Sequence, residues 1–180
     1  MHFIVLYGDH DDLFLGKVLA SALQKYGGVV RLSAGRVEGT MDPVPEYLIA
    51  EYDTPPRLLL ERGLFVFKHK VSCTAPVELP TGFKAVVHSA SPSSLALLKN
   101  AECPAVVCGM SSRDTVTLSG LQQPSAAVSV QRQIVDCMGG VIEAREIPVS
   151  LSCPLKGYPL LAACAVLLLT RGEPERGFAL

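Results

Sequence analysis

The chain has 180 residues, of which 49% are hydrophobic and 18% charged, and its formal net charge is −1. This length suits one domain that buries about 70% of its unfolded surface. The scattered lysines and arginines argue against nucleic acid or an anionic membrane as a partner, while the low charge content favours an apolar contact surface for a protein partner or a second copy.

Cysteine usage and the absence of a signal-type leader predict reduced thiols and a cytoplasmic protein. The six cysteines form no C-x-x-C pair; they are Cys73, Cys103, Cys108, Cys137, Cys153 and Cys164. The longest apolar run, Leu160 to Leu169, is far shorter than the roughly 20 residues of a membrane-spanning helix. We therefore expect it to form a core helix.

The chain begins with an expected strand, helix and strand. His2 to Tyr7 is an apolar run rich in β-formers, and apolar residues from Leu13 to Leu23 then recur at helical spacing up to Gly27-Gly28. Val29 to Leu32 is a second strand, and Ser33 to Pro45, with its glycines and prolines, is a loop.

Short buried strands follow, at Tyr47 to Glu51, Leu64 to Phe67, Phe83 to Val87 and Ala105 to Cys108. They are separated by a helical turn over Arg57 to Glu61, a loop over Val71 to Gly82, and a helix over Leu95 to Lys99 that Ser91 caps and Pro92 begins. This alternation predicts a three-layer α/β fold with a mostly parallel sheet and helices on both faces over residues 1–110.

The pattern changes after residue 110. Thr115 to Leu118, Ala127 to Gln133 and Val141 to Val149 predict a small antiparallel appendage over 111–150, with a hairpin turn at Met138-Gly139-Gly140. Leu155 to Thr170 is an apolar helix that closes the single domain (151–170). Arg171 to Leu180 is expected to be a fraying tail.

An acidic loop joins the first strand to the first helix, where phosphate-binding loops usually lie. A phosphate cradle needs small residues, a lysine and a hydroxyl, whereas Gly8-Asp9-His10-Asp11-Asp12 has one glycine and three carboxylates. Asp12 at about 4 Å from a phosphate would repel it by several kilocalories per mole at an effective dielectric constant of about 20. We therefore expect no nucleotide turnover at this loop.

Taken in order, these segments resemble the central, ATP-binding domain of the Mur ligases, which form amide bonds in peptidoglycan and folylpolyglutamate synthesis. Ile4 to Leu13 stands where that family has a strand ending in G-T-N-G-K-T. Gly8 matches the first glycine, but Asp11, Asp12 and Leu13 stand on the second glycine, the lysine and the threonine. Val29 to Gly35 resembles the family's second strand and the glycine after it.

The resemblance continues along the chain with other motif residues replaced. Tyr47 to Glu51 resembles the strand ending in a metal-binding glutamate, which Glu51 retains, but Lys68 to Ser72 replaces N-x-x-x-D-H. Three later segments match in position. Val87 to Pro92 stands on the N-A-D-D-P turn but lacks its asparagine and acids, and Val106 to Met110 resembles the strand end F-G-L/Y-G. Gly157 to Ala165 resembles the family's last helix without its histidine and asparagine.

The resemblance implies a P-loop-like topology that has lost its ATP machinery, and a chain of this length has no room for the other two domains of such ligases. Three hypotheses of function follow. The first is a non-catalytic binding or scaffolding domain. The second is a metal- or cysteine-dependent enzyme for a small molecule, and the third is a structural subunit that pairs with its own copy.

The candidate ligand-binding residues are Gly8, Asp9, His10, Asp11, Asp12, Glu51, Lys68, His69 and His88. No cofactor is predicted; the alternative is a divalent metal ion on Asp9, His10, Asp11 and Glu51, because carboxylates and imidazole suit such an ion. Otherwise, the acidic residues cap the helix and complement its dipole.

Two further groups have both a functional and a structural interpretation. One group, at the end of a central strand, consists of Lys68, His69 and Lys70. In a parallel α/β sheet the carboxyl ends of the strands line the binding crevice, so these residues either meet an anionic ligand there or are solvated. His88, at another strand end, either lines this crevice or caps a helix. Cys108 is a nucleophile only if His88 acts as its base; otherwise it is a core thiol. Arg113-Asp114 and Arg132 either bind an anion or form a surface ion pair.

Overall fold

An 11-stranded sheet in the order β13-β12-β9-β8-β7-β6-β5-β1-β4-β2-β3 forms the frame of the computed structural model, which describes residues 1–42, 44–73, 75–99 and 101–180. Its strands are β1 (His2–Tyr7), β2 (Val29–Ser33), β3 (Arg36–Gly39), β4 (Tyr47–Tyr52), β5 (Arg62–Phe67), β6 (Gly82–His88), β7 (Ala105–Gly109), β8 (Val116–Gln122), β9 (Ser125–Val130), β12 (Arg145–Ser150) and β13 (Phe178–Ala179). The helices are α1 (Phe14–Gln24), α2 (Pro92–Leu98) and α3 (Tyr158–Arg171), and β10 (Ile134–Val135) pairs with β11 (Val141–Ile142) in a separate hairpin.

The predicted parallel core is confirmed. Strands β2, β4, β1, β5, β6 and β7 run parallel, with Leu6 beside Glu51 of β4 and Tyr7 beside Phe67 of β5. Their carboxyl ends therefore meet at one edge of the sheet. In an open α/β sheet this is the edge where ligands bind.

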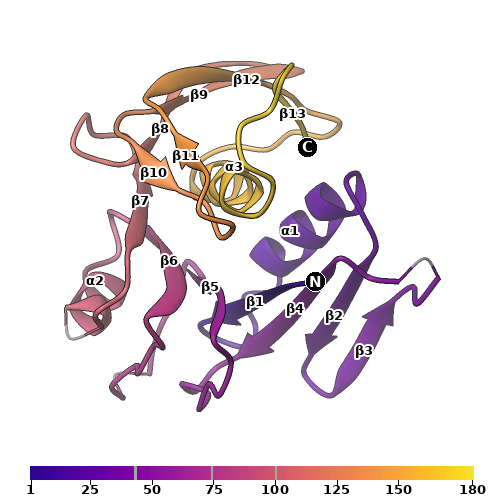
Figure 1. The fold of residues 1–180 in the computed structure, drawn as a ribbon, viewed down its shortest axis with the longest axis vertical. Coiled ribbons are helices and arrows are strands. Elements are labelled where there is room, and N and C mark those ends of the chain that lie inside the picture. Colours follow the sequence, from indigo (N-terminus) through magenta and orange to yellow (C-terminus); the bar gives the residue numbers. More distant parts are fainter. Residues whose placement is uncertain (43, 74, 100) are drawn as a thin grey trace.

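Helices cover both faces of the sheet, as predicted (Figure 1). On one face α1 and α3 pack against inward residues such as Ile4 and Leu6. On the other face Tyr7 and Phe65 belong to a second core, with partly buried leucines of α2 packed against it. The alternation of side chains along β1 explains this division, because successive residues of a strand point to opposite faces.

The predicted antiparallel region is present, and its strands β8, β9 and β12 extend the main sheet. β8 begins beside the end of β7, where Cys108 pairs with Val116, and β9 and β12 follow it in order. These strands curl over α3 (Figure 1). Because α3 is enclosed in this way, all its residues except Pro159 and Arg171 are buried, and it forms the predicted core helix.

Two predictions between β2 and β5 are wrong. The predicted loop over 33–45 contains β3, which pairs with β2 through a two-residue turn in which Ala34 (φ 46°) and Gly35 (φ 75°) adopt the positive φ values of a hairpin turn. No helical turn forms over Arg57 to Glu61. The short span between Pro56 and β5 does not repay the cost of nucleating a helix.

The predicted fraying tail is also wrong. Phe178 and Leu180 are buried, β13 pairs with β12, and the Ala179 N–H donates to the Tyr26 hydroxyl at 2.7 Å. Apolar residues at alternate positions let this short segment close one edge of the sheet.

The remaining predicted strands are confirmed, except that a break at residues 143–144 divides Val141 to Val149 into β11 and β12. The Met138-Gly139-Gly140 turn connects β10 to β11 as predicted. α3 begins at Tyr158 rather than at Leu155. Pro92 begins α2 after Ser91, as predicted, but the Ser91 side chain makes no capping hydrogen bond and its Oγ lies 2.8 Å from Ser94 Oγ. Pro43 and Thr74, which fall in predicted loops, lie outside the described residues.

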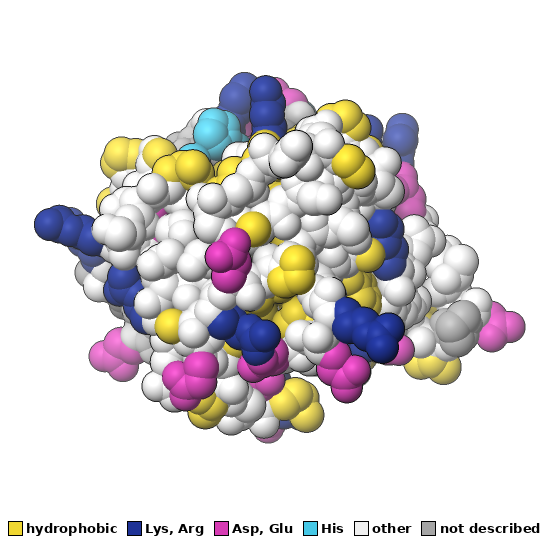
Figure 2. Space-filling view, turned by 90° about the horizontal axis from the view of Figure 1, so that it is seen from above, with side chains coloured by type: hydrophobic (Ala, Val, Ile, Leu, Met, Phe, Trp, Pro, Cys, Tyr) yellow, Lys and Arg dark blue, Asp and Glu magenta, His cyan; other side chains and the backbone are white. Residues whose placement is uncertain are grey.

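Charged and hydrophobic side chains are interspersed on the face that Figure 2 shows, which agrees with the scattered charges of the sequence. Within the described residues, none of the helices is both long enough and apolar enough to span a bilayer. All six cysteines are free thiols.

Candidate functional site

The acidic loop after β1 uses its own backbone amides within the protein. Gly8 has a φ of +150°, and a Cβ atom at this position would lie 2.5 Å from the Lys70 carbonyl oxygen. Four loop amides donate hydrogen bonds: Gly8 N to Tyr52 O (3.0 Å), Asp9 N to Lys70 O (2.9 Å), Asp12 N to Asp9 O (3.1 Å) and Leu13 N to Asp11 O (3.0 Å). These groups are therefore not free to bind a phosphate.

Two carboxylates of the loop bind the segment that follows β5. Asp9 accepts hydrogen bonds from the Ser72 hydroxyl (2.8 Å) and amide (2.9 Å), and the hydroxyl bond is the main cause of its lowered pKa. Asp12 accepts from the amides of His69 (3.1 Å) and Lys70 (3.4 Å). The carboxylates thus hold residues 69–72 beside the loop.

The helix-capping interpretation of these acids is wrong. The N-cap of α1 is Leu13, no side chain bonds the first amides of the helix, and its first turn has no acidic residue. Asp11 instead lies 3.1 Å from His10 in an exposed pair. The helix begins at Phe14, so all three acids precede its first turn.

Beside the loop, Glu51 lies in a buried ionic cluster. Its Oε1 accepts a hydrogen bond from Arg31 Nε at 2.5 Å, and its Oε2 lies 2.7 Å from Lys68 Nζ. The exposed fractions of the three side chains are 4% for Glu51, 9% for Arg31 and 1% for Lys68. Lys68 Nζ also donates to the Asp9 carbonyl oxygen at 3.2 Å, so the cluster connects β2, β4 and β5 to the loop.

A glycine of α1 makes room for this cluster. A Cβ atom on Gly16 would lie 2.4 Å from Glu51 Oε1, so any larger residue there would press on the buried carboxylate. The predicted metal ligands do not come together: within the described part of the chain, no three His, Cys, Asp or Glu side chains converge to hold a metal ion. Two cationic side chains instead contact Glu51.

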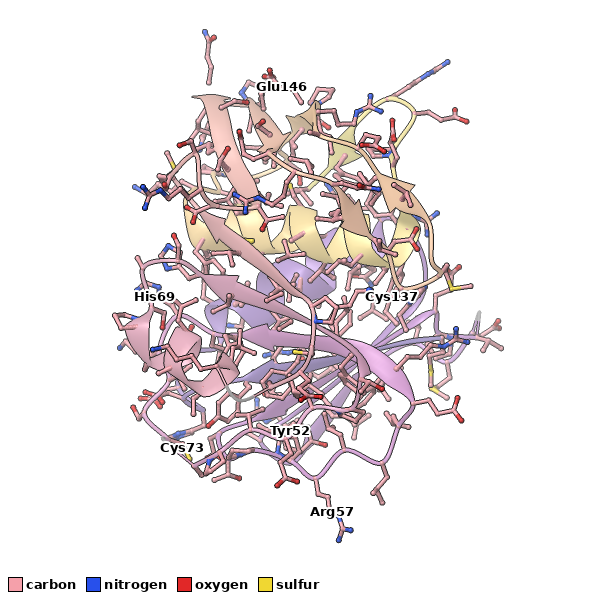
Figure 3. All side chains as sticks on the ribbon, turned by 60° about the vertical axis from the view of Figure 1, so that its left-hand side comes forward. Tyr52, Arg57, His69, Cys73, Cys137 and Glu146 are labelled. Atoms are coloured by element: carbon pink, nitrogen blue, oxygen red, sulfur yellow. The ribbon has the colours of Figure 1, made fainter. Side chains whose placement is uncertain are left out.

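A cavity of about 770 Å³ opens at the same edge of the sheet but on the other side of the loop. Its walls come from the loops after β1, β5 and β7, the end of β6, strand β8 and the first residues of α1 and α3. They are formed by Asp11, Asp12, Phe14, Leu15, His69, Lys70, His88, Met110, Leu118, Leu121, Lys156, Gly157, Tyr158 and Pro159. Figure 3 shows His69 on the opposite side of the molecule from Cys137.

His88 forms part of the wall of this cavity. Its ring stacks on Tyr158 at a centroid distance of 4.8 Å and lies 5.7 Å from the ring of His69. Tyr158 is fixed in turn, because its hydroxyl donates to the Phe67 carbonyl oxygen at 2.5 Å. Burial and the charge of His69 lower the pKa of His88 below its ordinary value of 6.5. The side chain thus lines the cavity instead of capping α2.

The other candidate residues are structural. Burial raises the pKa of Cys108 well above its usual range, so its thiol lacks the exposure and thiolate character of a nucleophile, although it pairs in register with His88. Asp114 is buried and accepts hydrogen bonds from Ser89 Oγ (3.1 Å) and the Ser111 amide (2.9 Å). Arg132 donates to the Arg113 carbonyl oxygen.

The sequence interpretation missed Arg31, Lys156, Tyr158 and the apolar walls Leu118 and Leu121. Arg31 had a usable signal, because a charged residue in a short apolar strand requires a partner when it is buried. Lys156 and Tyr158 stand at the start of the Ala-rich helix, but nothing in their spacing indicated a cavity.

The sequence matches no protein-family model and no curated protein. Among solved structures, it is similar to a MurF ligase from Thermotoga maritima in complex with ADP, at 11% identity and a TM-score of 0.51, over 92% of this chain and 44% of that one. It is also similar to a UDP-N-acetylmuramoyl-L-alanyl-D-glutamate–2,6-diaminopimelate ligase, at 7% identity and a TM-score of 0.51, over 94% and 42%.

These similarities confirm the predicted fold, a mostly parallel Mur ligase-like α/β sheet with helices. The chain spans less than half the length of the two ligases that it matches. At these identities the likeness concerns the fold, so function has to be inferred from the site.

Proposed function

We propose that this protein is a non-catalytic, Mur ligase-like binding domain that takes a small molecule at the carboxyl edge of its sheet and does not turn over ATP. The observation behind this proposal is the loop after β1, in which the amides of residues 8, 9, 12 and 13 all donate within the protein. A phosphate-binding loop works by pointing such amides at the anion.

The charges around the loop support the same proposal. The loop carries three carboxylates, Asp9, Asp11 and Asp12, and no lysine, so its charge disfavours a phosphate. Glu51, the one residue kept from the ligases' metal-binding motif, contacts Arg31 and Lys68. A Mg²⁺ ion at Glu51 would have to displace these cations from a buried position, at a desolvation cost for each displaced charge.

The cavity provides the place for a ligand. Its volume of about 770 Å³ falls within the range of small-molecule sites, roughly 300 to 1,000 Å³, and its walls combine apolar side chains with a few polar ones. It lies outside the carboxyl ends of parallel strands, where α/β sheets bind ligands. The predicted protein partner or second copy remains a prediction.

Calorimetric titration with ATP and magnesium tests the proposal. We expect no heat of binding from the wild-type protein, and none from Asp12→Ala, because the amides remain occupied when one carboxylate is removed. Asp42→Ala, which removes an exposed acid outside the loop, is the matched control. Micromolar ATP binding by the wild type that changes in Asp12→Ala but not in Asp42→Ala would refute the proposal.

A further inference from the structure

The walls of the cavity are mainly apolar and partly exposed. Phe14 is 57% exposed, Met110 71% and Leu121 39%, and all three line the cavity together with the more buried Leu15 and Leu118. Large side chains from α1, β8 and the loop after β7 thus gather around a single opening. This arrangement suits a ligand with an apolar body.

Two lysines at the cavity are available to an anionic group. In the described structure neither Lys70 nor Lys156 forms an ion pair, and both line the cavity. Lys70 and Lys156 therefore have no carboxylate partner among the described residues, whereas, of the two carboxylates there, Asp12 is hydrogen-bonded to backbone amides and Asp11 lies beside His10.

The N-terminus of α3 adds to this field. The first residues of α1, which has 11 residues, and of α3, which has 14, line the cavity. No side chain caps either N-terminus and neither first turn has an acid. The positive end of the α3 dipole therefore faces the cavity without an internal anion, whereas Asp11 and Asp12 stand just before α1.

His88 supplies a hydrogen-bond donor in the wall. Its Nδ1 is buried without a partner among the described residues, so Nε2 is the nitrogen that can meet a ligand. An unpaired buried lone pair is tolerated better than an unpaired buried N–H group, which places the proton of the neutral ring on Nε2. An N–H group there matches an acceptor such as a carboxylate oxygen.

We propose that the cavity binds an amphiphilic monocarboxylate, with its apolar body against Phe14, Leu118 and Leu121 and its carboxylate between Lys156 and His88. This inference rests on the proposed function, because it names the ligand class of the same cavity. It needs no covalent step.

A series of ligands with one tail and three head groups tests this assignment. Decanoate, 1-decanol and decylammonium, each below its micellar concentration, are titrated into the full chain by calorimetry at pH 7.5. We expect decanoate to bind at least tenfold more tightly than decylammonium, with decanol between them. Equal affinities, or tighter binding of decylammonium, would overturn the assignment of an anionic group.

Four variants locate the site. Lys156→Met should weaken decanoate by about three- to fivefold and decanol little, while Lys99→Met, which changes an exposed lysine at the end of α2, should change neither. His88→Phe, which can keep the stacking on Tyr158, should weaken decanoate about tenfold. Leu121→Glu should abolish binding, whereas Val135→Glu, a similarly exposed position on β10 outside the cavity, should not.

The two proposals fail separately. Decanoate binding that is unchanged in Lys156→Met, His88→Phe and Leu121→Glu would place the ligand elsewhere and overturn the assignment. The absence of decanoate binding would also overturn it, while leaving the proposed lack of ATP binding intact. ATP binding at the acidic loop would refute the proposed function whatever decanoate does.

Discussion

The two sides of the sheet's carboxyl edge use their polar groups in opposite ways. On the side of β4 and β2, Glu51, Arg31 and Lys68 pair with one another in a buried cluster. On the side of β6 and β8, Lys70, Lys156 and the first residues of α3 line a cavity of about 770 Å³, and neither lysine has an ion-pair partner in the described structure. One side is closed by internal charges and the other is open.

This difference separates stability from binding within one edge of the fold. Buried charges that pair with one another are costly to disturb, because each depends on the other for compensation. The exposed lysines at the cavity are solvated and cost little stability, whereas the buried Nδ1 atom of His88 has no partner among the described residues and does cost stability. Substitutions on the closed side should therefore affect unfolding, and those on the open side should affect ligand binding.

The largest effect is expected from Lys68→Met on the closed side. The change leaves Glu51 with Arg31 alone in a buried position, and we expect the free energy of unfolding to fall by about 3–5 kcal/mol. Lys70→Met, which removes an exposed lysine two residues away, should change it by less than about 0.5 kcal/mol. Urea unfolding followed by circular dichroism measures both.

A double variant shows whether charge pairing is the cause. Replacing both residues, as in Glu51→Leu with Lys68→Met, removes the buried pair together and should recover part of the stability that the single variant loses. If the losses of Glu51→Leu and Lys68→Met simply add, the two side chains do not compensate each other, and the closed side is not held by its charges.

The loop that joins the two sides should be the next most sensitive. Gly8→Ala puts a Cβ atom 2.5 Å from the Lys70 carbonyl oxygen at a φ of +150°, and we expect a loss of about 2–3 kcal/mol. Gly35 also has a positive φ but has nothing within 4 Å of such an atom, so Gly35→Ala should cost only about 1 kcal/mol. Equal losses in the two variants would mean that the close approach of residue 70 does not matter.

The fold could be predicted from the sequence where the signal is local. Strand β1, helix α1 and the apolar α3 follow from hydrophobic runs and periodicity. β13 could not be predicted in this way, because two apolar residues among glycines and charges become a strand only where β12 offers a free edge. For the same reason β8 looked like part of an appendage, since its pairing with β7 depends on the curl of the whole sheet.

The candidate site, too, could be predicted only where the signal is local. Residues 8–12, Lys68, His69 and His88 could be singled out because they stand at strand ends, and the structure brings them to one edge. The partners of these residues could not be predicted from the sequence. Lys68 contacts Glu51 across the intervening strand β1, and Asp9 bonds Ser72, which lies 63 residues later in the chain. Such contacts are set by tertiary packing, and no spacing in the chain encodes them.

On the open side, His88→Phe should raise stability slightly while it weakens decanoate binding. The variant removes an Nδ1 atom that is buried without a described partner, so the free energy of unfolding should increase by up to about 1 kcal/mol. If His88→Phe raises stability while it lowers the affinity for decanoate, it contrasts with Lys68→Met, which should lower stability. A clear loss of stability in thermal unfolding would show that the imidazole pairs within the protein and that this wall is closed too.

The smallest effect is expected at Asp9, where the closed side reaches solvent. The Ser72 hydroxyl holds the pKa of Asp9 below its ordinary value of 3.8, so Ser72→Ala should raise it towards that value, as a carboxyl-carbon NMR titration would record. A depressed folded-state pKa contributes stability above the unfolded-state pKa, and this contribution disappears as the pH falls through the folded-state pKa. The acid-unfolding curve of Ser72→Ala should therefore lie closer to that of Asp9→Asn than the wild-type curve does. The control Ser93→Ala, which changes a serine at the start of α2, should leave the Asp9 titration unchanged. If Ser93→Ala shifts the titration as much as Ser72→Ala does, the contact between the loop and residues 69–72 is not what stabilises the Asp9 carboxylate.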